Sequence, residues 1–109
     1  MNKQHRLCKN EHILGVINSK QKKIADNINI FYKENDLKNW RIAIIASKKN
    51  FPLAVIRNKI KRQAKAMIRE INFPFPSLDI VLVIKSNWIQ ATYQENKEKL
   101  KNIFSKLIK

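Results

Sequence analysis

The chain has 109 residues, of which 23 are Lys or Arg and eight are Asp or Glu, so its formal net charge is +15 at pH 7. Hydrophobic residues make up 44% of the sequence, which excludes a wholly disordered chain, and the length fits a single domain spanning residues 1–109. So large a charge opposes compaction and is typical of proteins that bind a polyanion. The alternative is a soluble, lysine-rich chain whose composition reflects its genome, but the charge favours nucleic-acid binding.

Other features restrict the cellular setting. Cys8 is the only cysteine, so no intrachain disulfide can form and a reducing environment is expected. The first ten residues contain no apolar segment typical of a signal peptide. The longest apolar runs, Ile42–Ala46 and Ile80–Ile84, are too short to cross a bilayer. We therefore expect a cytoplasmic protein that has no contact with a membrane.

The first half of the chain predicts one short helix and two strands. Asn10 is placed to cap a helix that carries Ile13, Val16 and Ile17 on one face. From residue 28 to 33, Ile28, Ile30 and Tyr32 alternate with Asn29, Phe31 and Lys33, which indicates a strand with one chiefly buried face. A polar turn at Glu34–Lys38 leads into a second strand, Trp40–Ala46.

The second half predicts two helices around a further strand. Leu53–Glu70 has helical period, with Leu53, Ile60, Ala64, Met67, Ile68 and Ile71 on one side. Phe73–Pro76 cannot continue a helix and is expected to be extended. Asp79–Lys85 reads as a strand and Ser86–Gln90 as a loop. Thr92 and Glu95 form a capping box before a final helix whose apolar stripe is Leu100, Ile103, Phe104, Leu107 and Ile108.

The predicted order is helix, two strands, helix, strand, helix, with room for another strand around Ile24. This pattern is typical of an α+β fold in which helices pack on a small mixed sheet.

The segment from Lys48 to Arg69 holds eight basic residues and no acid before Glu70. On the helix, Lys61, Lys65 and Arg69 form an uncompensated row, whereas a merely solvated face is usually of mixed sign because like charges four residues apart repel. Guanidinium groups match phosphate oxygens, and Asn58 can bond to a sugar or a base edge. A basic amphipathic helix also suits an anionic membrane, but here its apolar face is needed to cover the sheet.

Catalytic signals are weak. His5 and His12 have no Cys, Asp or Glu partner at the spacing of metal ligands, and the acids are scattered. Asp79 opens a strand and is expected to form a cap or an ion pair. There is no phosphate-binding glycine loop and no evident triad, so no catalytic residue and no metal site are expected in the protein.

The run Arg57-Asn58-Lys59-Ile60-Lys61-Arg62 resembles the hallmark of the protein subunit of bacterial ribonuclease P. It follows Ser47-Lys48-Lys49 and Ala54-Val55, as in that family. The similarity extends in order from Arg6-Leu7 through Tyr32 and the strand at Asp79 to the final helix, and so covers nearly the whole chain.

This resemblance implies an α+β fold with a left-handed crossover and a noncatalytic protein that binds a catalytic RNA. The RNA removes the 5′ leader of precursor tRNA with Mg²⁺ that is expected on the RNA, so the protein is the accessory subunit of an endoribonuclease and needs no small-molecule cofactor. The RNA-binding positions carried over are Lys48, Lys49, Arg57, Asn58, Lys59, Lys61, Arg62, Lys65 and Arg69. The leader-binding cleft carried over is Ile13, Ile17, Ile30 and Tyr32.

Three positions depart from the family pattern. Ile13 and Ile17 stand where phenylalanines are common, and Lys65 stands where Arg is usual. In addition, the segment Asn50–Leu53 replaces a glycine-bearing turn.

Two alternative functions would use the same basic helix. The first is a ribosomal or RNA-chaperone protein that binds structured RNA without processing it. The second is a protein that binds duplex DNA, which is less compatible with a helix face suited to phosphates rather than to base edges.

Overall fold

The computed structural model describes residues 6–7, 9–19, 21–37, 39–71 and 77–107. The elements follow in the order α1 (Asn10–Ile17), β1 (Lys22–Ile24), β2 (Ile28–Glu34), β3 (Arg41–Ile45), α2 (Ala54–Ile71), β4 (Leu78–Ile84), a 3₁₀ helix (Ser86–Gln90) and α3 (Tyr93–Leu107). This order confirms the predicted α+β arrangement, including the extra strand at Ile24. The expected loop after β4 is instead a short helix that buries Trp88.

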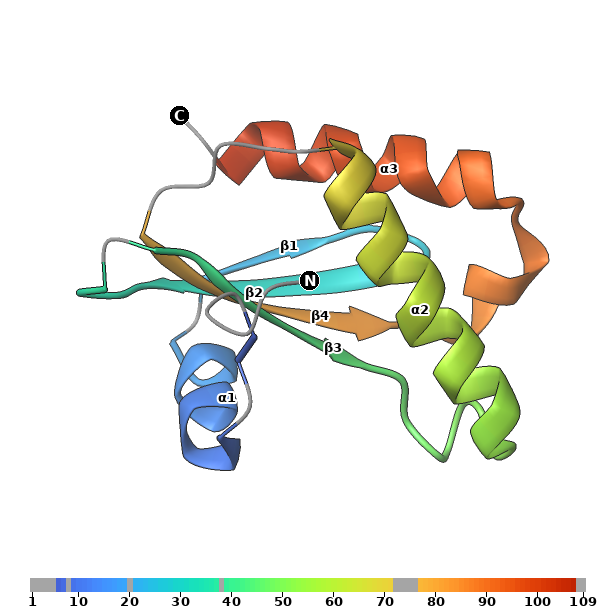
Figure 1. Cartoon of the computed structure of the whole chain (residues 1–109), viewed down its shortest axis with the longest axis horizontal. Coiled ribbons are helices and arrows are strands. Elements are labelled where there is room, and N and C mark those ends of the chain that lie inside the picture. Colours follow the sequence, from blue (N-terminus) through green and yellow to red (C-terminus); the bar gives the residue numbers. More distant parts are fainter. Residues whose placement is uncertain (1–5, 8, 20, 38, 72–76, 108–109) are drawn as a thin grey trace.

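The four strands form one mixed sheet in the order β1-β2-β4-β3 (Figure 1). β4 pairs antiparallel with β2 and parallel with β3, so β2 and β3 are not neighbours although they follow one another in the chain. In Figure 1, α2 lies in front of the sheet, β3 and β4 run left to right, and β4 lies above β3. A right-handed connection would place β4 below β3 in this view, so the β3–α2–β4 crossover has the rare left-handed sense that the resemblance implied.

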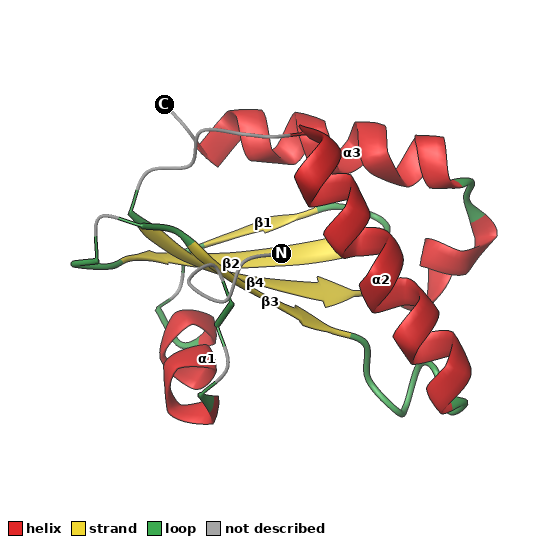
Figure 2. Cartoon of the chain, viewed as in Figure 1, coloured by secondary structure: helices red, strands yellow, loops and turns green. Residues whose placement is uncertain are grey.

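Helices cover the sheet on both faces, with α1 on one face and α2 and α3 on the other (Figure 2). The larger core lies under α2 and α3 and includes Ile30 and Ile80 from the sheet, Met67 from α2 and Phe104 from α3. The smaller core lies under α1 and includes Val16, Ala43 and Val81. Because successive strand residues point to opposite faces, the two cores alternate along β2, β3 and β4.

The helix ends confirm one predicted cap and correct another. Thr92 and Glu95 form the capping box: each backbone N–H donates to the other residue's side-chain oxygen, at 3.1 Å in both cases. Asn10 is not a cap, because the residue that precedes α1 is Lys9 and it makes no side-chain capping bond. Leu53 precedes α2 and is 65% exposed, so its expected place in the buried stripe is wrong.

Two buried amides fasten α3 to the sheet. Asn27 donates to the side-chain oxygen of Asn96 at 2.8 Å, and Asn96 donates to the carbonyl of Trp88 at 3.0 Å. Buried amides are stable only when paired, so this chain of bonds fixes α3 relative to the β1–β2 turn and the 3₁₀ helix. The expectations for His5, Cys8, Phe73–Pro76, Ile108 and the side chain of Leu107 fall outside the described residues.

Candidate nucleic-acid interface

Helix α2 separates an apolar stripe from a basic one, as its sequence predicts. Ile60, Ala64, Met67 and Ile68 are buried against the sheet and α3. The polar residues of the motif on this helix remain accessible. The exposed ones are Asn58, Lys59, Arg62 and Arg69, and the half-buried ones are Arg57, Lys61 and Lys65. Since the apolar stripe is already covered by the protein's own core, the basic stripe is the charged face of α2 that is available to a partner.

The positive charge of this stripe is not neutralised by the protein itself. Within the described residues, the ion pairs join Arg41 to Asp79, Lys97 to Glu70 and Lys99 to Asp26, and none involves a basic residue of the motif. Glu70, the one acid of α2, faces α3, where it also accepts a hydrogen bond from the Tyr93 hydroxyl. These bonds from Tyr93 and Lys97 lower the pKa of Glu70, which therefore stays ionised and engaged with α3 rather than with the basic stripe.

Arg57 has a role within the protein that the motif did not reveal. Its guanidinium donates to the carbonyls of Phe51 and Pro52 at 2.8 and 2.9 Å, and Phe51 is buried. At the other end of the same loop, the Phe51 backbone N–H donates to the Ser47 carbonyl at 2.9 Å. The turn that carries Lys48 and Lys49 is thus held at both ends and presents these two exposed lysines beside the start of α2.

A second part of the predicted site lies under α1. Ile13 and Ile17 are half-buried and pack on the smaller core, as do Phe31, Ile45 and Val83 from the sheet. In Figure 1, α1 covers only one end of the strands on this face. The half-buried apolar side chains therefore border the sheet surface that α1 leaves open.

The structure corrects two residues of the predicted cleft. Ile30 is fully buried and belongs to the larger core, and Tyr32 packs against the same core, so both face α2 and α3 rather than α1. Residues 30 and 32 of a strand necessarily share a face, and Phe31 points to the opposite one. Phe31 is therefore the aromatic residue of the β2 strand that lies on the α1 side. The alternation noted in the sequence contained this information, but not which face α1 would cover.

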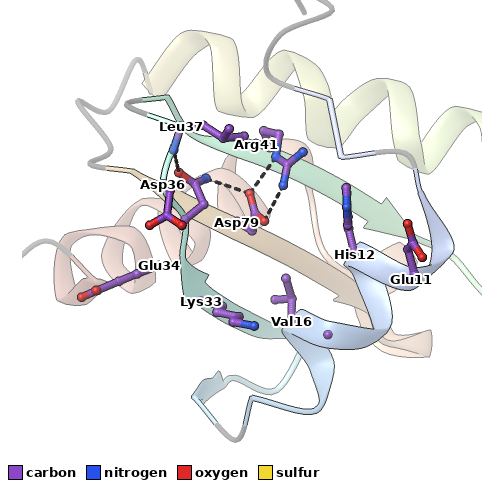
Figure 3. Close-up of a pocket in the computed structure, with 11 residues that line it drawn as sticks. Glu11, His12, Val16, Lys33, Glu34, Asp36, Leu37, Arg41 and Asp79 are labelled. Carbon is purple, nitrogen blue, oxygen red and sulfur yellow. Dashed lines mark hydrogen bonds and ion pairs between the residues drawn. The ribbon is translucent and has the colours of Figure 1, made fainter.

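A pocket of about 430 Å³ opens between α1 and the β2–β3 turn (Figure 3). On its sheet side, Arg41 donates to both carboxylate oxygens of Asp79, at 2.8 and 2.7 Å, and Asn35 donates to Asp79 at 2.8 Å. Burial raises the pKa of Asp79, but the bonds from Arg41 and Asn35 outweigh it, so the pKa lies below its ordinary value. The expectation that Asp79 forms an ion pair is confirmed.

The described residues contain no group of three or more His, Cys, Asp or Glu side chains that could hold a metal ion. No helix in the described part of the chain has the length and apolar character needed to cross a membrane.

The family described as Ribonuclease P matches residues 1–108. The chain belongs to the ribonuclease P protein family. It is 39% identical over 102 residues to the ribonuclease P protein component of Ureaplasma parvum, a match that covers 94% of this chain and 90% of that relative. The component of Mycoplasma genitalium is 32% identical over 98 residues, covering 90% of this chain and 76% of the relative. The protein is thus a subunit of ribonuclease P, the ribonucleoprotein endonuclease of tRNA 5′ maturation, and RNA binding follows from the family.

Solved structures of the family share the fold. The ribonuclease P protein of Staphylococcus aureus superposes with a TM-score of 0.86 over 97% of both chains at 20% identity. That of Thermotoga maritima superposes with a TM-score of 0.80, covering 90% of this chain and 95% of that one at 21% identity. Arrangements so alike at such low identity indicate that the ribonuclease P protein fold rests on the pattern of apolar residues rather than on particular side chains.

Proposed function

We propose that the protein is the noncatalytic subunit of ribonuclease P and that the basic stripe of α2 binds its RNA partner. The observation that carries this proposal is the uncompensated charge of α2 on a helix whose other face is already used by the core. Phosphate groups attract such a surface strongly, and each contact releases counterions. The contacting residues are the nine of the motif, with Arg57 acting partly through the loop that it holds.

We also propose that the open sheet surface beside α1 contacts the 5′ leader of precursor tRNA. Phe31 can stack on a leader base, while Ile13 and Ile17 offer only apolar contact. Chemistry that uses Mg²⁺ is assigned to the RNA, because RNA phosphates supply the hard oxygen ligands that this ion prefers. The protein's contribution is to reduce repulsion between phosphates and to hold the precursor, and we place it in the cytoplasm, where bacterial transcripts arise.

The test is cleavage of a precursor tRNA by the matching catalytic RNA at limiting Mg²⁺, measured with and without the protein. The proposal predicts that the protein restores cleavage at the correct 5′ position and lowers the Mg²⁺ concentration needed for half-maximal rate. Tight RNA binding without any restoration of cleavage would contradict the proposal and favour a purely structural or chaperone role.

A further inference from the structure

The glycine in α1 has no explanation in the protein's own packing. Gly15 is the only glycine of the chain, and it lies inside the helix, where glycine is less favourable than alanine. A Cβ atom built on Gly15 would meet no heavy atom of the described structure within 4 Å. Gly15 lines the 430 Å³ pocket, so its missing side chain leaves the wall of that pocket open.

The facing wall of this pocket is held in place by hydrogen bonds among its own side chains. The Arg41 guanidinium is held by two bonds to Asp79, and the side chains of Arg41 and Asp79 are only 20% and 10% exposed. Asn35 holds Asp79 from a second direction, and its own side-chain oxygen accepts the backbone N–H of Leu37 at 3.0 Å (Figure 3). A guanidinium fixed in one plane and largely neutralised is a surface on which an uncharged planar ring can stack.

The rim of the pocket differs in charge from the rest of the protein. Three exposed acids line it, Glu11, Glu34 and Asp36, together with one exposed base, Lys33, and none of the four forms an ion pair within the described residues. Carboxylates repel phosphates but accept hydrogen bonds from amino and imino groups. Acids outnumber the one exposed lysine on this rim, so the pocket disfavours phosphate groups and offers carboxylate acceptors to a neutral planar group with N–H donors on its edge.

We propose that this pocket holds one unpaired nucleobase of RNA and prefers guanine. Guanine carries N1–H and N2–H₂ side by side, which match the two oxygens of one carboxylate, whereas uracil has no such pair of donors. A volume of about 430 Å³ lies in the range of small-ligand sites and accommodates a base with part of its ribose. The inference rests on the proposed RNA-binding function and adds a base preference to it.

The first experiment measures binding of the intact protein to four labelled pentanucleotides, UUGUU, UUAUU, UUCUU and UUUUU, at constant salt. UUGUU is expected to bind about tenfold more tightly than UUUUU. In ¹H–¹⁵N spectra, UUGUU is expected to shift the Gly15 amide and the Arg41 Nε signals more than UUUUU does. Equal affinities for all four, or equal shifts at Gly15 and Arg41, would overturn the proposal without affecting the Mg²⁺ test of the proposed function.

Variants separate the pocket from the charge of the whole protein. A Cβ atom at Gly15 has free space, so Gly15→Leu extends a side chain from the open wall and should abolish the preference for UUGUU while leaving UUUUU binding unchanged. Asn10→Leu adds the same side chain to an exposed position of α1 outside the pocket and should keep the preference. Glu11→Gln, Glu34→Gln and Asp36→Asn identify the accepting carboxylate, and a preference retained in Gly15→Leu would refute the assignment.

The source of the base is distinguished in the assembled enzyme. If the base belongs to the substrate, Gly15→Leu should weaken binding of precursors with guanine in the leader but not of precursors with an all-uracil leader. If it belongs to the catalytic RNA, Gly15→Leu should weaken protein–RNA assembly in the absence of any precursor. Each of these results supports the pocket and assigns its occupant.

Discussion

Replacing Lys61, Arg62 and Lys65 by alanine should weaken RNA binding in a way that depends on salt. All three lie on the basic stripe of α2, and none forms an ion pair within the described residues. Alanine is favourable in a helix, so the backbone of α2 should be unaffected. The change removes three positive charges while the buried face of the helix remains intact.

The magnitude follows from counting phosphate contacts. Each lost contact should reduce the slope of log K against log salt concentration by about 0.7–0.9, so the triple variant should lose roughly 2–3 units of slope. At 0.1 M salt this corresponds to an affinity about 100- to 500-fold lower, and the difference should fall toward zero near 1 M. Hydrophobic contacts would give a loss independent of salt.

The assay is a titration of the catalytic RNA with protein over a range of KCl concentrations at fixed Mg²⁺. The matched control is alanine at Lys22, Lys101 and Lys106, three exposed lysines of β1 and α3 that carry the same total charge. The control should leave the slope nearly unchanged. If both triple variants flatten the slope equally, only net charge matters; if the α2 variant leaves it unchanged, the interface lies elsewhere.

Three further predictions concern single positions. Gly15→Ala should raise the free energy of unfolding by about 1 kcal/mol in a denaturant titration, because it improves the helix without a clash; a loss of stability would contradict the open space at this residue. Arg41→Met should cost about 2–4 kcal/mol at pH 7, since it leaves Asp79 without its ion-pair partner. Because the pKa of Asp79 is lowered in the folded protein, the stability from this pair is present above the unfolded pKa near 4 and is lost as pH falls through the folded value; acid titration of Arg41→Met should therefore show a weaker loss below pH 4 than the wild type. Phe31→Ala should weaken binding of precursor tRNA that carries a leader by about 1–3 kcal/mol and should change binding of mature tRNA little. Tyr32→Ala should mainly lower the melting temperature of the protein. If Tyr32→Ala alone caused a leader-specific loss of binding, Tyr32 rather than Phe31 would be the aromatic residue of the leader-binding cleft.

Periodicity predicted those features that depend on neighbours in the chain. The apolar and basic stripes of α2 follow from 3.6 residues per turn, and the capping box needs only Thr92 and Glu95 at the right spacing. The helix that Phe31 faces could not be predicted, because apolar residues lie on both faces of β2. Alternation along the strand does not say which face α1 covers and which face α2 and α3 cover. The same holds for Arg57, whose acceptors depend on the path of the loop.

The pocket under α1 depends wholly on tertiary structure. It combines residues from α1, the β2–β3 turn and the start of β4, whose Asp79 is more than 60 positions from Gly15. Four of the eight acids scattered along the sequence thus meet at this pocket, three on its rim and one as the partner of Arg41. In the sequence the pocket leaves one trace, the single glycine within an otherwise regular helix, and a lone glycine does not by itself predict a pocket.

The strand order has a consequence for synthesis on the ribosome. β2 and β3 are separated in the sheet by β4, so neither contacts the other when both have emerged, and α2 follows them before β4 is made. Until residues 78–84 arrive, the apolar stripe of α2 has no complete sheet to cover, and α3 must follow to bury Phe104 against it. The nascent chain therefore carries its most basic segment exposed for much of its translation, and a folded RNA-binding surface is obtained only when nearly all of the described chain has left the exit tunnel.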